Sequence, residues 1–143
     1  PTVSTQRPFS WRKPSVPAPR SSFEYAVIRV TPRVDREEFI NAGVIVFCLE
    51  HGYLEARVQV DENRLRALWP AIDCDPVRTH LEAIPRICAG DAEAGPIAAL
   101  SPRERFHWLV APRSTIIQVS PAHAGITDAP AATLDRLFAQ LVG

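Results

Sequence analysis

The sequence contains no long apolar segment. Nowhere in its 143 residues does an uninterrupted apolar run approach the roughly 18 residues that a membrane-spanning helix needs. The amino-terminal part also lacks an apolar stretch of the kind found in signal peptides. These two absences argue against a membrane-embedded or exported protein. We therefore expect a cytoplasmic protein with no membrane partner.

Cysteine is scarce, and the common catalytic and metal-binding motifs are absent. Cys48, Cys74 and Cys88 are odd in number and lie far apart, which argues against a disulfide framework or a zinc site and fits a reducing compartment. The sequence has no P-loop, no G-x-S-x-G, no H-E-x-x-H and no paired histidines at metal spacing. We therefore expect no cofactor, no metal and no catalytic residue, and an enzyme is the less favoured class.

The chain has no excess of charge of either sign, but its charges are unevenly distributed along the sequence. The formal net charge is zero, yet residues 1–22 carry four basic side chains and no acid, so the remaining chain carries a net charge of −4. An acidic body argues against nucleic-acid binding. The first 22 residues also hold five of the fourteen prolines, which remove backbone donors and fix φ. We predict a basic, extended or disordered arm at 1–22 and one domain at 23–143.

Residues 24–60 have the patterns of three successive β-strands. Apolar and polar side chains alternate over 24–31 and again over 53–60, and the intervening run at 42–50 is almost wholly apolar, as in a strand buried on both faces. The His51-Gly52 pair is typical of a tight hairpin turn. This order predicts an antiparallel meander.

Helical spacing of apolar residues follows at 62–69, 76–89, 102–110 and 131–141. Ser101-Pro102-Arg103-Glu104 has the pattern of a capping box, and Asp75-Pro76 is a second start signal. Pro85 predicts a kink or break. Together with a fourth strand at 114–119, these segments predict an α+β fold. We expect an antiparallel sheet of about four strands, the meander at 24–60 plus 114–119, covered on one face by about four helices.

The strip from residue 103 to residue 125 concentrates side chains that bind anions. Arg103 and His107 lie four residues apart on one face of a predicted helix, and Arg113 follows at the corner between helix and strand. Arginine offers a planar fork of donors that matches phosphate or carboxylate, and histidine adds a proton-transfer group. The candidate residues of the strip are Arg103, Arg105, His107, Arg113, Ser114 and His123.

Two interpretations of this strip stay open. Its side chains can converge on one pocket edge and bind a ligand or an acidic partner loop. They can equally form an ordinary surface, in which the arginines are solvated or paired with acids such as Glu104 and Glu37. The same choice applies to Arg33, Arg36 and Asn41, which are either binding groups or part of a charged connector before the second strand.

The chain resembles the bacterial domain-of-unknown-function family 3037 over roughly residues 23–141. The resemblance rests on the strings YAVIRVTPRVDREEFINAGVIVFC, RLRALWP and RFHWLVAPRSTIIQVSPAHAGITDAPAATLDRLF, of which the segment ERFHWL-APRST is quite specific. It assigns no activity and no catalytic residue. Family members are small stand-alone proteins often encoded beside a kinase-like protein similar to the HipA toxin kinases, which implies a protein partner.

From the missing motifs and this resemblance we expect a small non-catalytic accessory or regulatory protein that binds a partner protein, with a HipA-like kinase as the suspected partner. The meander would then act like the β-rich module that HipA-type kinases carry or pair with, an analogy at the level of the fold. The alternative is a small enzyme or sensor that binds a phosphorylated or anionic ligand at the Arg/His strip.

Overall fold

The computed structural model describes residues 20–113 and 115–143, so the predicted arm lies almost wholly outside the described residues, as does Ser114. The strands are β1 (Ser21–Val30), β2 (Ile40–Cys48), β3 (Tyr53–Val58), β4 (Ile117–Val119) and β5 (His123–Thr127). The α-helices are α1 (Glu62–Leu68), α2 (Cys74–Cys88), α3 (Pro102–Val110) and α4 (Pro130–Leu141). Short 3-10 turns lie at η2 (Val34–Arg36), η3 (Ala92–Ala94) and η4 (Pro96–Ala99). Among the described residues, no helix is both long enough and apolar enough to cross a membrane.

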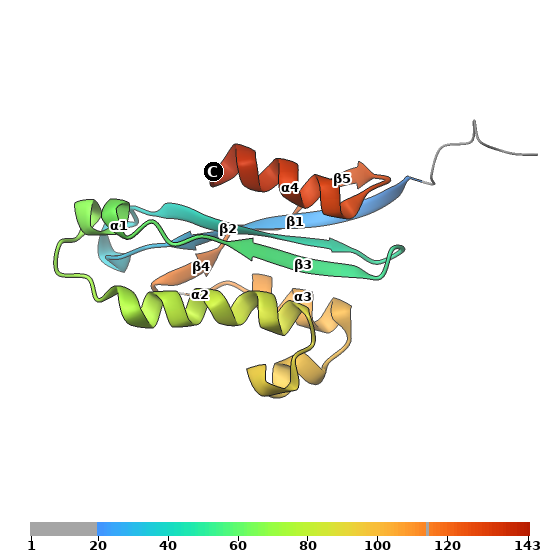
Figure 1. The fold of residues 1–143 in the computed structure, drawn as a ribbon, viewed down its shortest axis with the longest axis horizontal. Helices are drawn as coiled ribbons and strands as arrows, with labels where there is room; N and C mark the ends of the chain where they lie inside the picture. Colours follow the sequence, from blue (N-terminus) through green and yellow to red (C-terminus); the bar gives the residue numbers. More distant parts are fainter. Residues whose placement is uncertain (1–19, 114) are drawn as a thin grey trace, which may run out of the picture.

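All strand pairs in the sheet are antiparallel, which confirms the predicted meander and the α+β class (Figure 1). The strand order is β3-β2-β1-β4, and β5 also pairs with β1. The ten-residue β1 accommodates both short strands along one edge: β5 pairs with residues 21–25 and β4 pairs with residues 28–30.

β5 was not predicted, because its sequence HAGIT has a weak strand pattern that contains a glycine. The glycine is required there. A Cβ added at Gly125 would lie 2.6 Å from the Phe23 ring, so only glycine lets β5 approach β1 at this point. The predicted strand at 114–119 is shorter than expected, since only residues 117–119 pair with β1.

The prediction that the helices cover one face of the sheet is wrong, since they cover both (Figure 1). α2 and α3 lie against one face, where the larger core cluster includes Ile45 and Phe47 of β2. α4 lies against the opposite face, where Leu134 and Leu137 pack with Val46. β2 is buried on both sides, so its continuous apolar run serves two cores.

The structure confirms the predicted start of α3 and places the start of α2 earlier than predicted. Ser101 accepts a hydrogen bond from the Glu104 backbone N–H at 3.2 Å and donates its own N–H to the Glu104 carboxylate at 3.1 Å, so the capping box forms. α2 begins earlier than predicted, with Asp73 as the residue that caps it. It also runs through Pro85 to Cys88 without the predicted break. Apolar burial in its last turn offsets the missing hydrogen bond.

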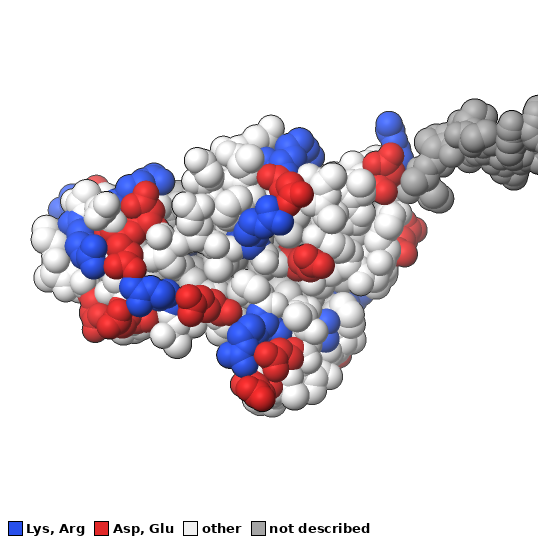
Figure 2. All heavy atoms as spheres, viewed as in Figure 1, with Lys and Arg blue, Asp and Glu red and all other residues white. Residues whose placement is uncertain are grey.

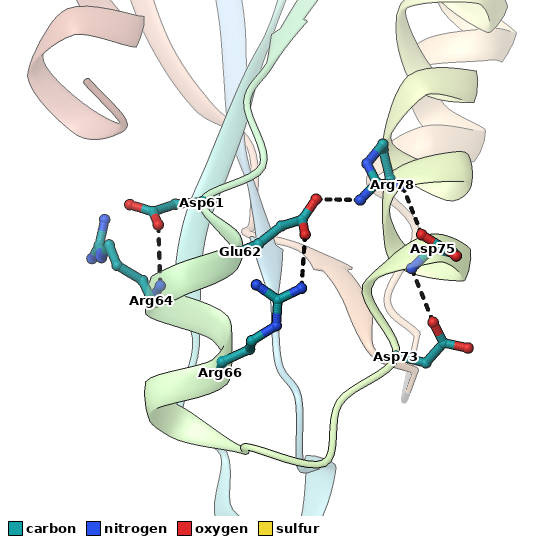
Figure 3. Close-up of polar contacts among 7 residues, drawn as sticks. All are labelled: Asp61, Glu62, Arg64, Arg66, Asp73, Asp75 and Arg78. Atoms are coloured by element: carbon teal, nitrogen blue, oxygen red, sulfur yellow. Dashed lines mark hydrogen bonds and ion pairs between the residues drawn. The ribbon is translucent and has the colours of Figure 1, made fainter.

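Ion pairs connect α1 to the start of α2 (Figure 3). The Glu62 carboxylate accepts hydrogen bonds from Arg66 on its own helix, at 3.0 Å, and from Arg78 on α2. Arg78 also contacts Asp75 at 2.9 Å. The neighbouring arginines, Arg78 above all, hold the pKa of Glu62 below its ordinary value. Figure 2 shows charges of both signs interspersed on the face in view, with a dense group at the end where α1 lies.

Candidate functional site

The structure distributes the strip of residues 103–125 over several places. Arg103, at the start of α3, lines a pocket of about 370 Å³ together with Glu50 and with His123 of β5. Arg113 lies beyond the other end of α3 and lines different pockets. Ten residues of chain separate the two arginines, on the order of 15 Å at the helical rise per residue. The structure therefore does not bring Arg103 and Arg113 together, and His107 is exposed on the helix between them.

Arg105 has a structural role. Its guanidinium donates hydrogen bonds to the backbone carbonyls of Leu100 at 2.7 Å, Cys88 at 3.3 Å and Ala98 at 3.4 Å. These contacts connect α3 to the end of α2 and to the loop between them. Arg105 therefore holds these segments together, while its Nε is buried without a hydrogen-bond partner among the described residues, as is that of Arg29.

The three candidates near β2 also have partners within the protein. Arg33 pairs with Asp35 at 2.9 Å, and Arg36 pairs with Glu38 at 2.8 Å. Both pairs are exposed, and ion pairs of this kind contribute little to stability. Asn41 donates to the carbonyl of Leu141 at 3.0 Å and so connects β2 to the last turn of α4.

Arg113 closes the end of α3 and retains an uncompensated charge. Its guanidinium donates to the carbonyls of Trp108 at 2.6 Å, Leu109 at 3.2 Å and Ala111 at 3.3 Å. It also lies 4.4 Å above the centre of the Trp108 ring. A cation is favourable beside the free carbonyls of a helix end. Within residues 20–113 and 115–143, Arg113 forms no ion pair with an acid, Glu37 included.

Arg29 is a candidate site residue that the sequence patterns did not single out. It lies on β1, opposite Asn41 of β2 on one side and Gln118 of β4 on the other. Its guanidinium stacks on the exposed ring of Phe39, 4.4 Å from the ring centre. The Arg29 Nε is buried and has no hydrogen-bond partner in the part of the chain that is described. The available signal was an arginine two residues after Val27 and four after Tyr25, on the less buried face of the predicted strand.

Arg29 and Arg113 line one open pocket of about 330 Å³, which we call the arginine pocket. Its remaining lining residues are Thr31, Val34, Glu37, Phe39 and Gln118. Two guanidinium groups and one amide can bind an anionic group. Across the described residues, no group of three or more His, Cys, Asp or Glu side chains is arranged to hold a metal ion.

Exposed apolar side chains lie in this pocket or next to the residues that line it. Phe39 and Trp108, which the two arginines cover, are 46% and 40% exposed. Val34 lines the pocket and is also exposed. Ile116 is exposed as well, and its carbonyl accepts the Thr31 N–H at 2.6 Å, which places it beside the pocket. We call this set the arginine–aromatic surface: Arg29, Val34, Phe39, Trp108, Arg113 and Ile116.

The cysteines are poorly placed for nucleophilic chemistry. Cys48 Sγ lies 3.2 Å from His51 Nδ1, a thiol–imidazole contact that would suit a nucleophile. However, Cys48 is completely buried, so no substrate reaches its sulfur in this conformation. Burial raises the pKa of the Cys88 thiol to about 12, which keeps it protonated near neutral pH.

Comparison with known proteins identifies the family. A family model described as "Protein of unknown function (DUF3037)" matches residues 25–142. No curated protein and no solved structure gives a match. The matched region contains the arginine pocket and every described element except the first four residues of β1. The chain therefore belongs to the domain-of-unknown-function family 3037.

Proposed function

We propose that this chain is a small non-catalytic accessory protein that binds a partner protein through the arginine–aromatic surface. One observation carries the proposal: two exposed aromatic rings, Phe39 and Trp108, each covered by an arginine, lie beside further exposed apolar side chains. Aromatic residues and arginine are enriched in protein interfaces and supply many of their energetic hot spots. A surface of this composition favours protein binding over catalysis.

The stacked arginines prepare this surface for binding. Each guanidinium restricts the aromatic ring beneath it, and Arg113 is itself held by three backbone carbonyls. Side chains ordered before association lose less conformational entropy when the complex forms. The two arginines that line the arginine pocket are suited to binding an anion, and among the lining residues only the Glu37 carboxylate is suited to proton transfer near neutral pH.

The partner we propose is a HipA-like kinase. The support for it is the resemblance described above, in which members of the family are often encoded beside such kinases. We place the protein in the cytoplasm, because its three cysteines are buried as free thiols, a state that a reducing compartment maintains. The net charge of −4 over residues 23–143 favours a protein partner over nucleic acid, and the face drawn in Figure 2 carries charges of both signs.

Binding of purified chain to a HipA-like kinase encoded beside its gene tests the proposal. We expect association at micromolar concentration or tighter by isothermal titration calorimetry. Phe39→Ser and Trp108→Ser should each weaken it by at least about tenfold, since a hot-spot side chain contributes roughly 2 kcal/mol. Ile126→Ser is the matched control, because Ile126 is 69% exposed on β5 and lies outside this surface.

Two results would contradict the proposal. The first is no association at micromolar concentration, which would remove the kinase as partner. The second is equal binding by all three variants, which would move the interface away from the arginine–aromatic surface. Thermal melting of each variant, compared with the wild type, separates a loss of affinity from a loss of the fold.

A further inference from the structure

We infer that the arginine pocket receives a carboxylate from an acidic segment of the bound partner. This inference rests on the proposed function, because it names the chemistry of the segment that the surface recognises. The first support is the state of Arg29. Its Nε is buried without a hydrogen-bond partner among the described residues, and none of the ion pairs there includes its guanidinium. Arg105 has an unpartnered Nε as well, but Arg29 lines the open arginine pocket together with a second arginine, so an anion that enters this pocket meets two guanidinium groups.

The second support is that a second arginine without an ion-pair partner among the described residues, Arg113, lines the same pocket. Arg113 comes to it from the end of α3 and Arg29 from β1, so 84 positions of chain separate them in sequence. Both are held in place, Arg29 by the ring of Phe39 and Arg113 by three carbonyls and Trp108. Gln118 lines the pocket as a neutral amide. Fixed arginines and an adjacent amide are suited to recognition of a planar carboxylate.

Glu37 decides which anion suits the pocket. Its side chain also lines the pocket, so two arginines and one glutamate give a net charge of +1. A single carboxylate balances this charge, whereas a phosphate dianion exceeds it and is repelled by Glu37. Glu37 occupies the left-handed backbone region, with φ 58°, where residues other than glycine are uncommon. Glu37 ends the 3-10 turn η2, where its backbone N–H donates to the Val34 carbonyl, and this turn positions it at the pocket.

Solution NMR of the full chain tests the inference with two matched peptides. The probe is acetyl-Ala-Glu-Ala-amide, whose only charge is the carboxylate, and acetyl-Ala-Gln-Ala-amide is its neutral counterpart. We expect the glutamate peptide to shift the Arg29 Nε–H resonance and the amide resonances of Thr31 and Gln118 in a saturable manner. The glutamine peptide should leave them unchanged. Inorganic phosphate should bind more weakly than the glutamate peptide.

Three variants make the test specific. Arg29→Gln should weaken binding of the glutamate peptide by at least about fivefold, because a charge-assisted hydrogen bond is lost. Arg64→Gln, which removes the same charge from an exposed position on α1, should leave binding unchanged. Glu37→Gln acts in the opposite direction: it should strengthen binding of both anions and raise the affinity for phosphate more. Because Glu37 is exposed, this variant keeps the test valid even where Arg29→Gln unfolds the domain.

The outcomes separate this inference from the proposed function. Equal shifts with both peptides, or binding that Glu37→Gln weakens, would overturn the carboxylate site. Phosphate binding tighter than that of the glutamate peptide would overturn the choice of anion. If the kinase associates while the glutamate peptide gives no saturable shift, the inference fails and the proposed function stands. If the peptide binds and the kinase does not, the carboxylate site stands and the kinase is removed as the partner that supplies the carboxylate.

Discussion

Replacement of Ser120 by alanine should destabilise the domain measurably, because one hydroxyl joins β1 to the segment between β4 and β5. Ser120 is completely buried. Its Oγ accepts the backbone N–H of Val27 at 2.9 Å and donates to the Pro121 carbonyl at 3.0 Å. The Ser120 N–H in turn donates to the Val27 carbonyl at 2.8 Å. The hydroxyl thus satisfies a strand donor at the point where β1 passes from one short partner to the other.

In Ser120→Ala the Val27 N–H keeps its buried position and loses its acceptor, whereas the exposed Pro121 can turn its carbonyl to water. A buried donor left unsatisfied costs about 1–3 kcal/mol. For a domain of this size, each 1 kcal/mol lowers the melting temperature by roughly 4 °C, so we expect a decrease of about 4–12 °C. Differential scanning calorimetry at pH 7 measures it.

Thr115→Val is the matched control, because it also removes a hydroxyl hydrogen bond near β4. The Thr115 Oγ1 donates to the Ile117 carbonyl at 2.7 Å, but this bond is exposed, and water replaces the lost partner. We expect a free-energy change of less than about 0.5 kcal/mol. Equal melting temperatures for Ser120→Ala and the wild type would refute the reasoning, since they would show that the Val27 N–H finds another partner.

Arg113→Ala should lower the free energy of unfolding by about 1–2 kcal/mol, because it removes a cation from a helix end and from an aromatic face. Urea titration measures this change. A loss above about 3 kcal/mol would contradict the reasoning, since it would indicate that Arg113 is a deeply buried charge. Gly125→Ala should lower the melting temperature by several degrees, because its Cβ would clash with the Phe23 ring; an unchanged melting curve would argue against the close approach. The pKa of Glu62 is lowered in the folded state, so its contribution to stability is present above the unfolded pKa and is lost as pH falls through the folded pKa. Thermal melts from pH 7 to pH 3 should therefore show the difference between wild type and Glu62→Gln shrinking in acid. The Cys88 thiol, with its pKa raised to about 12, should react with a thiol reagent at pH 8 only as fast as the domain opens, and rapid labelling would contradict its burial.

Much of the secondary structure could be predicted because its signals act between near neighbours. The capping box at Ser101 and Glu104 involves residues three positions apart, and the alternation in β1 and β3 reflects one strand at a time. Signals that depend on distant packing failed. β5 was missed because the need for Gly125 is set by Phe23, about a hundred residues earlier. Pro85 did not end α2, because burial of that turn against the sheet outweighs the lost backbone bond.

The candidate site depended still more on the tertiary structure. Sequence reasoning selected Arg113 from its position between a helix and a strand, yet placed it with Arg103 and His107, from which the structure separates it. It did not select Arg29, whose exposure, stacking and neighbours are determined by strands and loops from four parts of the chain.

By itself, the sequence determined the α+β class, the meander, the capped start of α3 and the membership of a family. Only the tertiary structure decided that α4 covers the second face of the sheet and that Arg29 and Arg113 share a pocket. The physical reason is the same in both cases. The sequence of an amphipathic helix shows that the helix has an apolar face, but it does not show which side of a sheet that face covers. The sequence likewise shows the charge of an arginine, but not which distant residues lie beside it in the fold.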